Sequence, residues 1–136
     1  MLVASKNENF LDQNIDWEFP IPIAYGPGRL SEIGLFCEQF QISNPLIITD
    51  EGSKNLPFIN RLITLLQKAS IPSKLFFGVS PNPRDDEIMA GCETYRSGKH
   101  DSIIAIGGGS AMDGAKAIGM TVNSGANLWD FEYRKP

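Results

Sequence analysis

A run of three glycines between an apolar stretch and a helix-forming segment limits the folds open to this chain more than any other feature. Residues 102–106 are the most strongly apolar stretch and predict a buried strand. The glycines at 107–109 follow directly, and Ser110 is expected to open a helix that runs to about Asn123. Glycines at such a turn let the backbone approach an anion closely, and the free N–H groups of the helix start point at that anion. The turn therefore predicts a site for a phosphate or pyrophosphate.

Strand and helix patterns alternate along the chain from residue 19 onward. Strands are expected at 19–25, 46–49, 75–77 and 102–106, and helices over 30–40, 58–69, 83–97 and 110–123. Pro20 and Pro22 lack the N–H group that a central strand needs, so the first strand is expected at a sheet edge. This alternation predicts an α/β fold of the Rossmann-like, doubly wound type, with a mostly parallel sheet between helices. Residues 1–17 are expected to form an N-terminal tail and residues 18–136 the α/β domain.

Composition and charge exclude several other classes of protein. Hydrophobic residues make up 42% of the chain and charged residues 21%, which is typical of a globular domain. The net charge of −4 and the scattered basic residues argue against nucleic acid as a partner. The apolar runs fall short of the ~18 residues of a membrane span, and the N-terminus lacks a signal-peptide pattern. We therefore expect no membrane association and a cytoplasmic location.

The chain offers little material for metal or disulfide chemistry. Cys37 and Cys92 form no C-x-x-C motif, which excludes a disulfide framework and argues against a zinc knuckle. A histidine-based metal site would depend on His100 alone, because the chain has one histidine. The position of His100 between a predicted helix and a predicted strand favours a surface role.

Ligands of open α/β sheets bind at the carboxyl ends of the strands, which makes Asp50, residues 80–83 and residues 107–110 the candidate site. The glycine turn also has a structural alternative, since Ser110 and Asp113 have the spacing of a helix capping box. The turn matches neither the P-loop nor the G-x-G-x-x-G pattern. Asp50 precedes the glycines, whereas the ribose-binding acid of a Rossmann motif follows them by ~20 residues. A dinucleotide site here would therefore have its parts in a permuted order.

Residues 107–116 resemble the GGGSxxDxAK signature of the iron-containing (group III) alcohol dehydrogenases. Three more segments resemble the family in the same order: the opening strand and turn at 23–28, the Thr-Asp strand end at 48–52 and the V-x-P-N-P loop at 79–83. The resemblance covers about residues 18–134. Glycerol dehydrogenases and dehydroquinate synthases are more distant relatives with the same architecture.

This resemblance implies an NAD(P)-binding domain and assigns roles to particular residues. Asp50 matches the acid that hydrogen-bonds the adenosine ribose, and its charge would repel a 2′-phosphate, so NAD is favoured over NADP. Gly108, Gly109 and Ser110 match the pyrophosphate cradle.

Two other residues of the resemblance keep a structural alternative. Asn82 matches a contact on the cofactor side of the site, and it could equally cap the helix that follows. Asp113 could contact the cofactor at the cleft or form an ion pair with Lys116 within the helix.

The resemblance also implies a second, all-helical domain in which an aspartate and three histidines bind Fe²⁺ or Zn²⁺. The chain stops at Pro136, before that domain, and has no such ligand set. We therefore expect the cofactor-binding part of an NAD-dependent alcohol dehydrogenase that interconverts an alcohol and an aldehyde or ketone, inactive as an isolated chain. An uncovered face could support a homo-oligomer. Two alternatives stay open: a stand-alone nucleotide-binding or interaction module without catalysis, and a glycerol dehydrogenase-like or dehydroquinate synthase-like relative.

Overall fold

A three-stranded parallel sheet forms the centre of the structure, a computed structural model that describes residues 14–18 and 21–132. The strands are β3 (Pro45–Asp50), β4 (Lys74–Val79) and β5 (Ser102–Ala105), in the spatial order β4-β3-β5. All of β3 up to Thr49 is buried, because helices cover both faces of the central strand. This burial explains the unbroken apolar run in the sequence.

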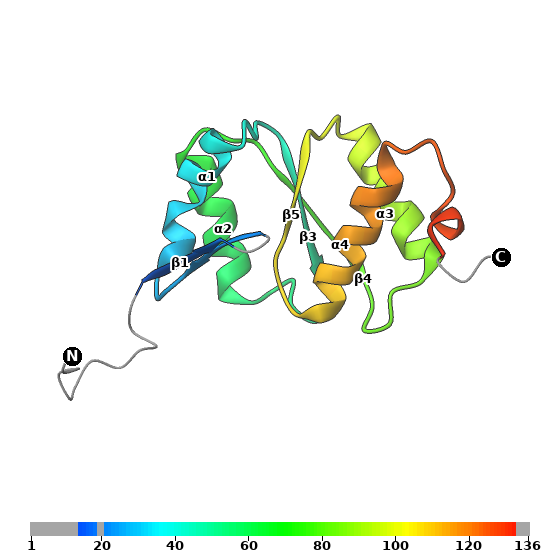
Figure 1. Cartoon of the computed structure of the whole chain (residues 1–136), viewed down its shortest axis with the longest axis horizontal. Helices are drawn as coiled ribbons and strands as arrows, with labels where there is room; N and C mark the ends of the chain where they lie inside the picture. The colour runs from blue at the N-terminus through cyan, green and yellow to red at the C-terminus, as the bar shows by residue number, and fades with distance from the viewer. Residues whose placement is uncertain (1–13, 19–20, 133–136) are drawn as a thin grey trace.

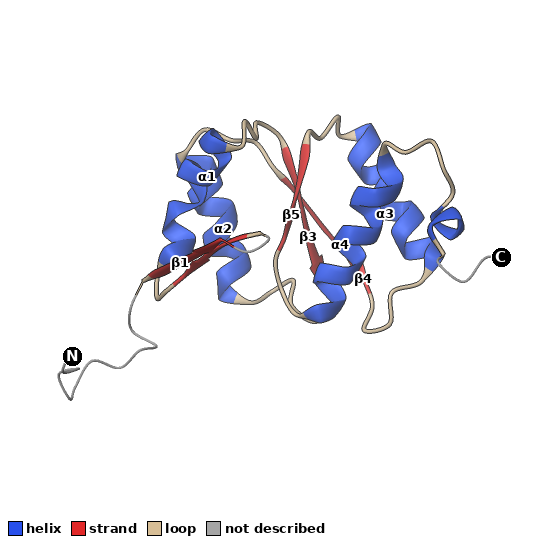
Figure 2. Cartoon of the chain, in the orientation of Figure 1, coloured by secondary structure: helices blue, strands red, loops and turns tan. Residues whose placement is uncertain are grey.

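Two pairs of helices enclose the sheet, one pair on each face (Figure 1, Figure 2). Their bounds are α1 (Ile33–Gln39), α2 (Pro57–Lys68), α3 (Asp85–Ser97) and α4 (Gly109–Val122). Ile47 points into the core shared with α1 and α2, and its neighbours Leu46 and Ile48 point into the core shared with α3 and α4. The α/β fold with a parallel sheet between helices is thus confirmed.

The connections that follow neighbouring strands lead to opposite faces of the sheet. The helix after β3, α2, covers one face, whereas the helix after β5, α4, covers the other. Neighbouring strands whose connections diverge in this way leave a crevice at their carboxyl ends. Figure 1 shows this end of the sheet at the bottom of the view, where β5 leads into α4.

The strand predicted over 19–25 does not belong to the parallel sheet, so its expected membership of that sheet is wrong. Its predicted edge position is confirmed, because both strands of its two-stranded sheet are edge strands. It is β2 (Pro22–Tyr25), which pairs antiparallel with β1 (Ile15–Glu18) in a separate sheet. Residues 19 and 20 lie outside the described residues. Alternation in the sequence identifies a strand but not its partner, and here the partner lies within the segment expected to be a tail. Two 3-10 turns, η2 (Arg29–Glu32) and η3 (Leu128–Phe131), complete the described elements.

His100 is buried, with only 8% of its surface exposed, so the expected surface role is wrong. Its Nδ1 lies 3.0 Å from the carbonyl oxygen of Asn44, and the Asn44 side chain donates hydrogen bonds to the carbonyls of Gly98 and Lys99. These contacts join the loops that precede β3 and β5, at the end of the sheet opposite to the crevice. The burial therefore depends on a loop 56 positions away in the chain.

Candidate functional site

A cavity of about 220 Å³ lies where the carboxyl ends of the three strands meet. The loop after β3, the end of β4 and the first turn of α4 each contribute part of its wall. The lining residues are Asp50, Glu51, Gly52, Val79, Pro81, Gly108, Gly109 and Ser110. We call this cavity the strand-end crevice.

The N-terminus of α4 opens onto the strand-end crevice without a side-chain cap. The helix begins at Gly109, one residue earlier than predicted, and Gly108 occupies the N-cap position. The N–H of Met112 makes the first helical bond, 3.1 Å to the carbonyl of Gly108, and the N–H groups before it have no acceptor within the helix. A Cβ built on Gly108 or Gly109 would meet no atom within 4 Å. The turn therefore offers amide donors and open space, which suits a phosphate group.

Ser110 ties this helix start to the neighbouring loop. Its hydroxyl donates a 2.8 Å hydrogen bond to the carbonyl oxygen of Pro81. The capping-box alternative for Ser110 and Asp113 is wrong, because Ser110 lies at the second helical position and its hydroxyl is committed to Pro81. The bond holds two walls of the strand-end crevice together.

Asp50 ends β3 and is half-buried against the glycine turn. Ser53 donates to both of its carboxylate oxygens, from the N–H to Oδ1 at 2.9 Å and from the hydroxyl to Oδ2 at 2.9 Å. On the other side, Gly107 has φ +138°, and a Cβ built there would lie 3.1 Å from Oδ2 of Asp50. The acid and the glycine turn therefore lie side by side in the same cavity, as a dinucleotide site with the acid before the glycines would require.

The charge of the strand-end crevice is negative. Asp50 and Glu51 line it, and no lysine or arginine of the described chain is among the lining residues. The nearby Lys54 forms an ion pair with Glu51, and its ammonium group lies 4.6 Å from the centre of the Phe77 ring. This lysine already has an anionic and an aromatic partner.

Asn82 does not line the strand-end crevice and does not cap α3, so the capping prediction is wrong. The N-cap residue of α3 is Arg84, whose N–H donates to Oε2 of Glu87 at 3.0 Å. This hydrogen bond holds the pKa of Glu87 below its ordinary value, against the opposing effect of burial, and donors from Ser80 add to it. The same Ser80 hydroxyl also lies 3.0 Å from the backbone carbonyl oxygen of Asn82, which is its alternative acceptor.

Asp113 also lies outside the lining of the strand-end crevice. Its carboxylate is 4.0 Å from the ammonium nitrogen of Lys116, and both side chains are about three-quarters exposed. The structure therefore brings together Asp50, Gly108, Gly109 and Ser110, and leaves Asp113 in the intrahelical ion pair.

Sequence reasoning missed the part that Ser53 plays at the site. The Asp-x-x-Ser spacing after a strand is a local signal for a turn in which the serine donates to the aspartate, and it could have identified Ser53. Pro81 lies in the predicted segment 80–83, but its hydrogen bond with Ser110 had no sequence signal, because the two residues are 29 positions apart.

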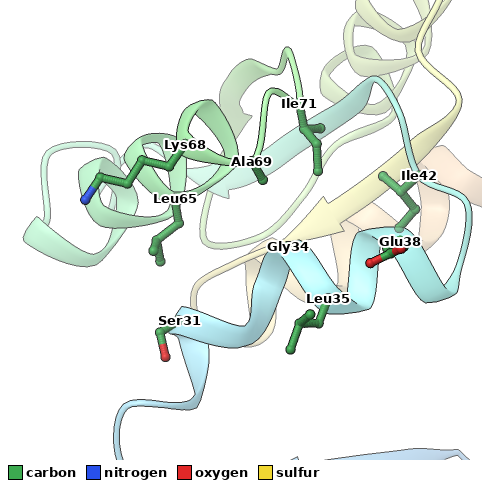
Figure 3. Close-up of a pocket in the computed structure, with 9 residues that line it drawn as sticks. All are labelled: Ser31, Gly34, Leu35, Glu38, Ile42, Leu65, Lys68, Ala69 and Ile71. Atoms are coloured by element: carbon green, nitrogen blue, oxygen red, sulfur yellow. The ribbon is translucent and has the colours of Figure 1, made fainter.

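A larger groove lies elsewhere, between α1 and α2 (Figure 3). Leu35, Leu65 and Ile71 supply apolar surface, and Glu38 and Lys68 are among its other lining residues. It shares no lining residue with the strand-end crevice. None of its walls comes from the carboxyl end of a parallel strand, so the strand-end crevice is the better candidate site despite its smaller volume.

The described residues contain no cluster of three or more histidine, cysteine, aspartate or glutamate side chains that could hold a metal ion. They therefore do not fit the metal that the family resemblance implies. Cys37 and Cys92 are buried free thiols, and burial raises the pKa of each. Within the described part of the chain, no helix has the length and apolar character needed to cross a bilayer.

The parallel sheet, its helices on both faces and the crevice at its carboxyl end define an open α/β architecture. The model of the iron-containing alcohol dehydrogenase family matches residues 20–136. The chain belongs to this family.

Individual relatives agree with the family match. The 1,3-propanediol dehydrogenase of Citrobacter freundii is 30% identical over 118 residues, which are 85% of this chain and 30% of that enzyme. The solved structure of a 1,3-propanediol oxidoreductase matches with a TM-score of 0.75 at 30% identity, covering 78% of this chain and 28% of that one. The structure of sulfoacetaldehyde reductase from Bifidobacterium kashiwanohense in complex with NAD⁺ matches with a TM-score of 0.72 at 27% identity. The match covers 82% of this chain and 29% of that one. The chain thus spans about 30% of the length of the curated relative.

Proposed function

We propose that this chain is the NAD-binding portion of an alcohol dehydrogenase and binds the dinucleotide in the strand-end crevice. The observation that carries the proposal is that Asp50 lies beside the glycine turn at the uncapped start of α4. This supports a site in which Asp50 would accept hydrogen bonds from ribose hydroxyls and the amides of the turn would donate to a pyrophosphate.

The strand-end crevice suggests a role for each of its residues. The amides of Gly108, Gly109 and Ser110 would donate to the pyrophosphate, aided by the positive end of the α4 dipole. The carboxylate of Asp50 would accept from the hydroxyls of the adenosine ribose. The bound cofactor supplies hydride transfer at its nicotinamide ring. The residues of this chain bind and orient it.

The charge of the strand-end crevice supports NAD rather than NADP as the cofactor. A 2′-phosphate near Asp50 would face the carboxylates of Asp50 and Glu51. Lys54, the cation that follows these residues in the chain, is paired with Glu51 and lies over the Phe77 ring.

We further propose that the 136-residue chain does not oxidise an alcohol by itself. The described residues hold no metal-binding cluster, and the chain spans only about 30% of its curated relative. An enzyme that polarises an alcohol oxygen with a metal needs ligands for that metal. The test is an assay of the chain with NAD⁺, a short-chain alcohol and added Fe²⁺ or Zn²⁺, in which a single turnover would refute this part.

Calorimetric titration of the chain with NADH and NADPH tests the cofactor proposal. We expect saturable binding of NADH and weaker binding of NADPH. The variant Asp50→Asn removes the charge and keeps the shape, so it should lower the NADH affinity by about tenfold and narrow the preference over NADPH. Asp113→Asn is the matched control, because its carboxylate lies outside the strand-end crevice. Unchanged NADH affinity in Asp50→Asn would contradict the assignment of Asp50.

A further inference from the structure

We propose that Ser53 is a positioning residue that fixes the carboxylate of Asp50 for the two ribose hydroxyls and thereby sets the preference for NAD over NADP. This inference rests on the proposed function of the strand-end crevice. Ser53 itself does not line that crevice. It would act through Asp50.

The geometry around Asp50 carries the inference. Ser53 gives one donor to each carboxylate oxygen, its N–H to Oδ1 and its hydroxyl to Oδ2, both at 2.9 Å. The same N–H lies 3.1 Å from the backbone carbonyl oxygen of Asp50, so a tight turn places Ser53 against the acid. Two bonds to different oxygens fix the rotation of the carboxylate, which one bond would leave free.

Two glycines, Gly52 and Gly107, lie beside the same carboxylate. A Cβ built on Gly52 would lie 3.2 Å from Oδ1, and a Cβ built on Gly107 would lie 3.1 Å from Oδ2. Both distances are tighter than ordinary van der Waals contact, so a side chain at either glycine would crowd the carboxylate. Ser53 holds the group by hydrogen bonds, and the two glycines leave it the space that it occupies.

A carboxylate held in this way still has acceptor capacity. An ionised aspartate has about four lone-pair sites, and Ser53 uses one on each oxygen. Asp50 lines the strand-end crevice, so the remaining sites are available to a ligand there. The vicinal hydroxyls of a ribose are two adjacent donors that match two adjacent acceptor oxygens. A 2′-phosphate in place of one hydroxyl would bring a second anion against a carboxylate that cannot turn away.

The alternative is that the Ser53 bonds only stabilise the turn after β3, as Asp-Ser turns commonly do. The two roles predict different results. A turn-stabilising role would lower thermal stability and would affect both cofactors equally. A positioning role would affect mainly the cofactor that uses the carboxylate as an acceptor.

The experiment compares the unchanged 136-residue chain with three single variants, Ser53→Ala, Ser53→Thr and Asp50→Ala, and with the double variant that combines Ser53→Ala and Asp50→Ala. Each protein is titrated calorimetrically with NADH and with NADPH, and its thermal unfolding is measured. We expect Ser53→Ala to weaken NADH binding by about five- to tenfold, less than the worth of a full hydrogen bond to a charged group, because the Ser53 N–H still holds Oδ1 of Asp50. The NADPH affinity should change less than about twofold, because that cofactor gains little from Asp50. Ser53→Thr keeps the hydroxyl and should restore most of the NADH affinity.

The double variant supplies the decisive comparison. If Ser53 acts through Asp50, Ser53→Ala has no further effect on NADH binding once Asp50 is alanine. An undiminished effect in the Asp50→Ala background, an equal loss for both cofactors, or no loss at all would overturn the inference while leaving the proposed function intact. Failure of the unchanged chain to bind NADH would instead overturn the proposed function, and this inference with it.

Discussion

The hydroxyl of Ser110 donates a 2.8 Å hydrogen bond to the carbonyl oxygen of Pro81. The bond joins the first turn of α4 to the loop after β4, although 29 positions separate the two residues. A crevice built from three separate loops keeps its shape only if those loops are held together. Ser110 does this for two of them, in addition to presenting its own N–H at the helix start.

Replacing Ser110 by alanine should loosen the strand-end crevice without unfolding the chain. The lost hydroxyl frees the loop at 80–84, so we expect NADH affinity to fall by about three- to tenfold, the range of one hydrogen bond. Amide hydrogen exchange at Ser80, Asn82 and Arg84, the residues of this loop that carry an N–H, should become faster. Ser124→Ala is the control, because its hydroxyl bonds Thr121 at the opposite end of α4. Equal loss of affinity in both variants would show that Ser110 has no special role.

The glycines of the turn should respond differently to alanine. Gly108 has φ −84° and open space around a built Cβ, so Gly108→Ala should keep stability within about 0.5 kcal/mol. The methyl group would nevertheless occupy the strand-end crevice and should lower NADH affinity by more than about tenfold. Urea unfolding and calorimetry separate the two effects. NADH binding unchanged by Gly108→Ala would place the cofactor elsewhere.

Gly107→Ala should instead destabilise the fold. The residue has φ +138°, and the new Cβ would lie 3.0 Å from Cβ of Ala111 and 3.1 Å from Oδ2 of Asp50. We expect a loss of about 1–3 kcal/mol in the free energy of unfolding, from backbone strain and crowding. Gly119→Ala is the control, since this exposed glycine lies within α4 and alanine there should stabilise the helix by up to about 1 kcal/mol. Wild-type stability in Gly107→Ala would contradict the close contact with Asp50.

Much of the architecture could be predicted from the sequence because its determinants are local. The apolar run at 46–49 and the glycines at 107–109 identify a buried strand and a strand-to-helix turn without knowledge of any partner. Because the strands are parallel, their carboxyl ends lie at one end of the sheet, and Asp50 and the glycine turn both follow such an end. The structure adds that the two line the same cavity and that Gly107 leaves no room for a side chain beside Asp50.

The features that sequence reasoning missed depend on distant partners or on small shifts of a helix start. The pairing of β2 with β1 needs a partner strand that pattern alone does not select. The burial of His100 depends on Asn44, far away in the chain. The N-caps of α3 and α4 are Arg84 and Gly108, each two residues away from the predicted cap, so Asn82 and Ser110 do not have the capping roles expected of them. At α4 a tertiary bond from Ser110 to Pro81 takes the hydroxyl that would have capped the helix, and at α3 the local Arg84–Glu87 pair takes the place expected of Asn82.

Asp101 should make the stability of the chain depend on pH in acid. Burial alone would raise its pKa, but hydrogen bonds from Ser43, Ser102 and Asn44 outweigh this effect and hold the pKa well below its ordinary value. A carboxylate with a lowered pKa stabilises the fold at neutral pH, and this stabilisation is lost as the pH falls below about 4.

The variant Asp101→Asn tests this dependence. We expect lower stability at pH 7 than in the unchanged chain, and a smaller further loss between about pH 4 and pH 2. Thermal unfolding across this range is the measurement. Asp113→Asn is the control, because its carboxylate makes only an exposed ion pair at 4.0 Å. Parallel pH curves for the unchanged chain and Asp101→Asn would contradict the role of this carboxylate.

The most direct test of the account is to locate bound NADH on the chain by two-dimensional NMR of the backbone amides. The account predicts saturable chemical-shift changes confined to the loops that form the strand-end crevice, largest at Gly108, Gly109 and Ser110 and present at Asp50 and Ser53. Changes centred instead on the groove between α1 and α2, at Leu35 and Leu65, would contradict it. So would the absence of any change at millimolar cofactor.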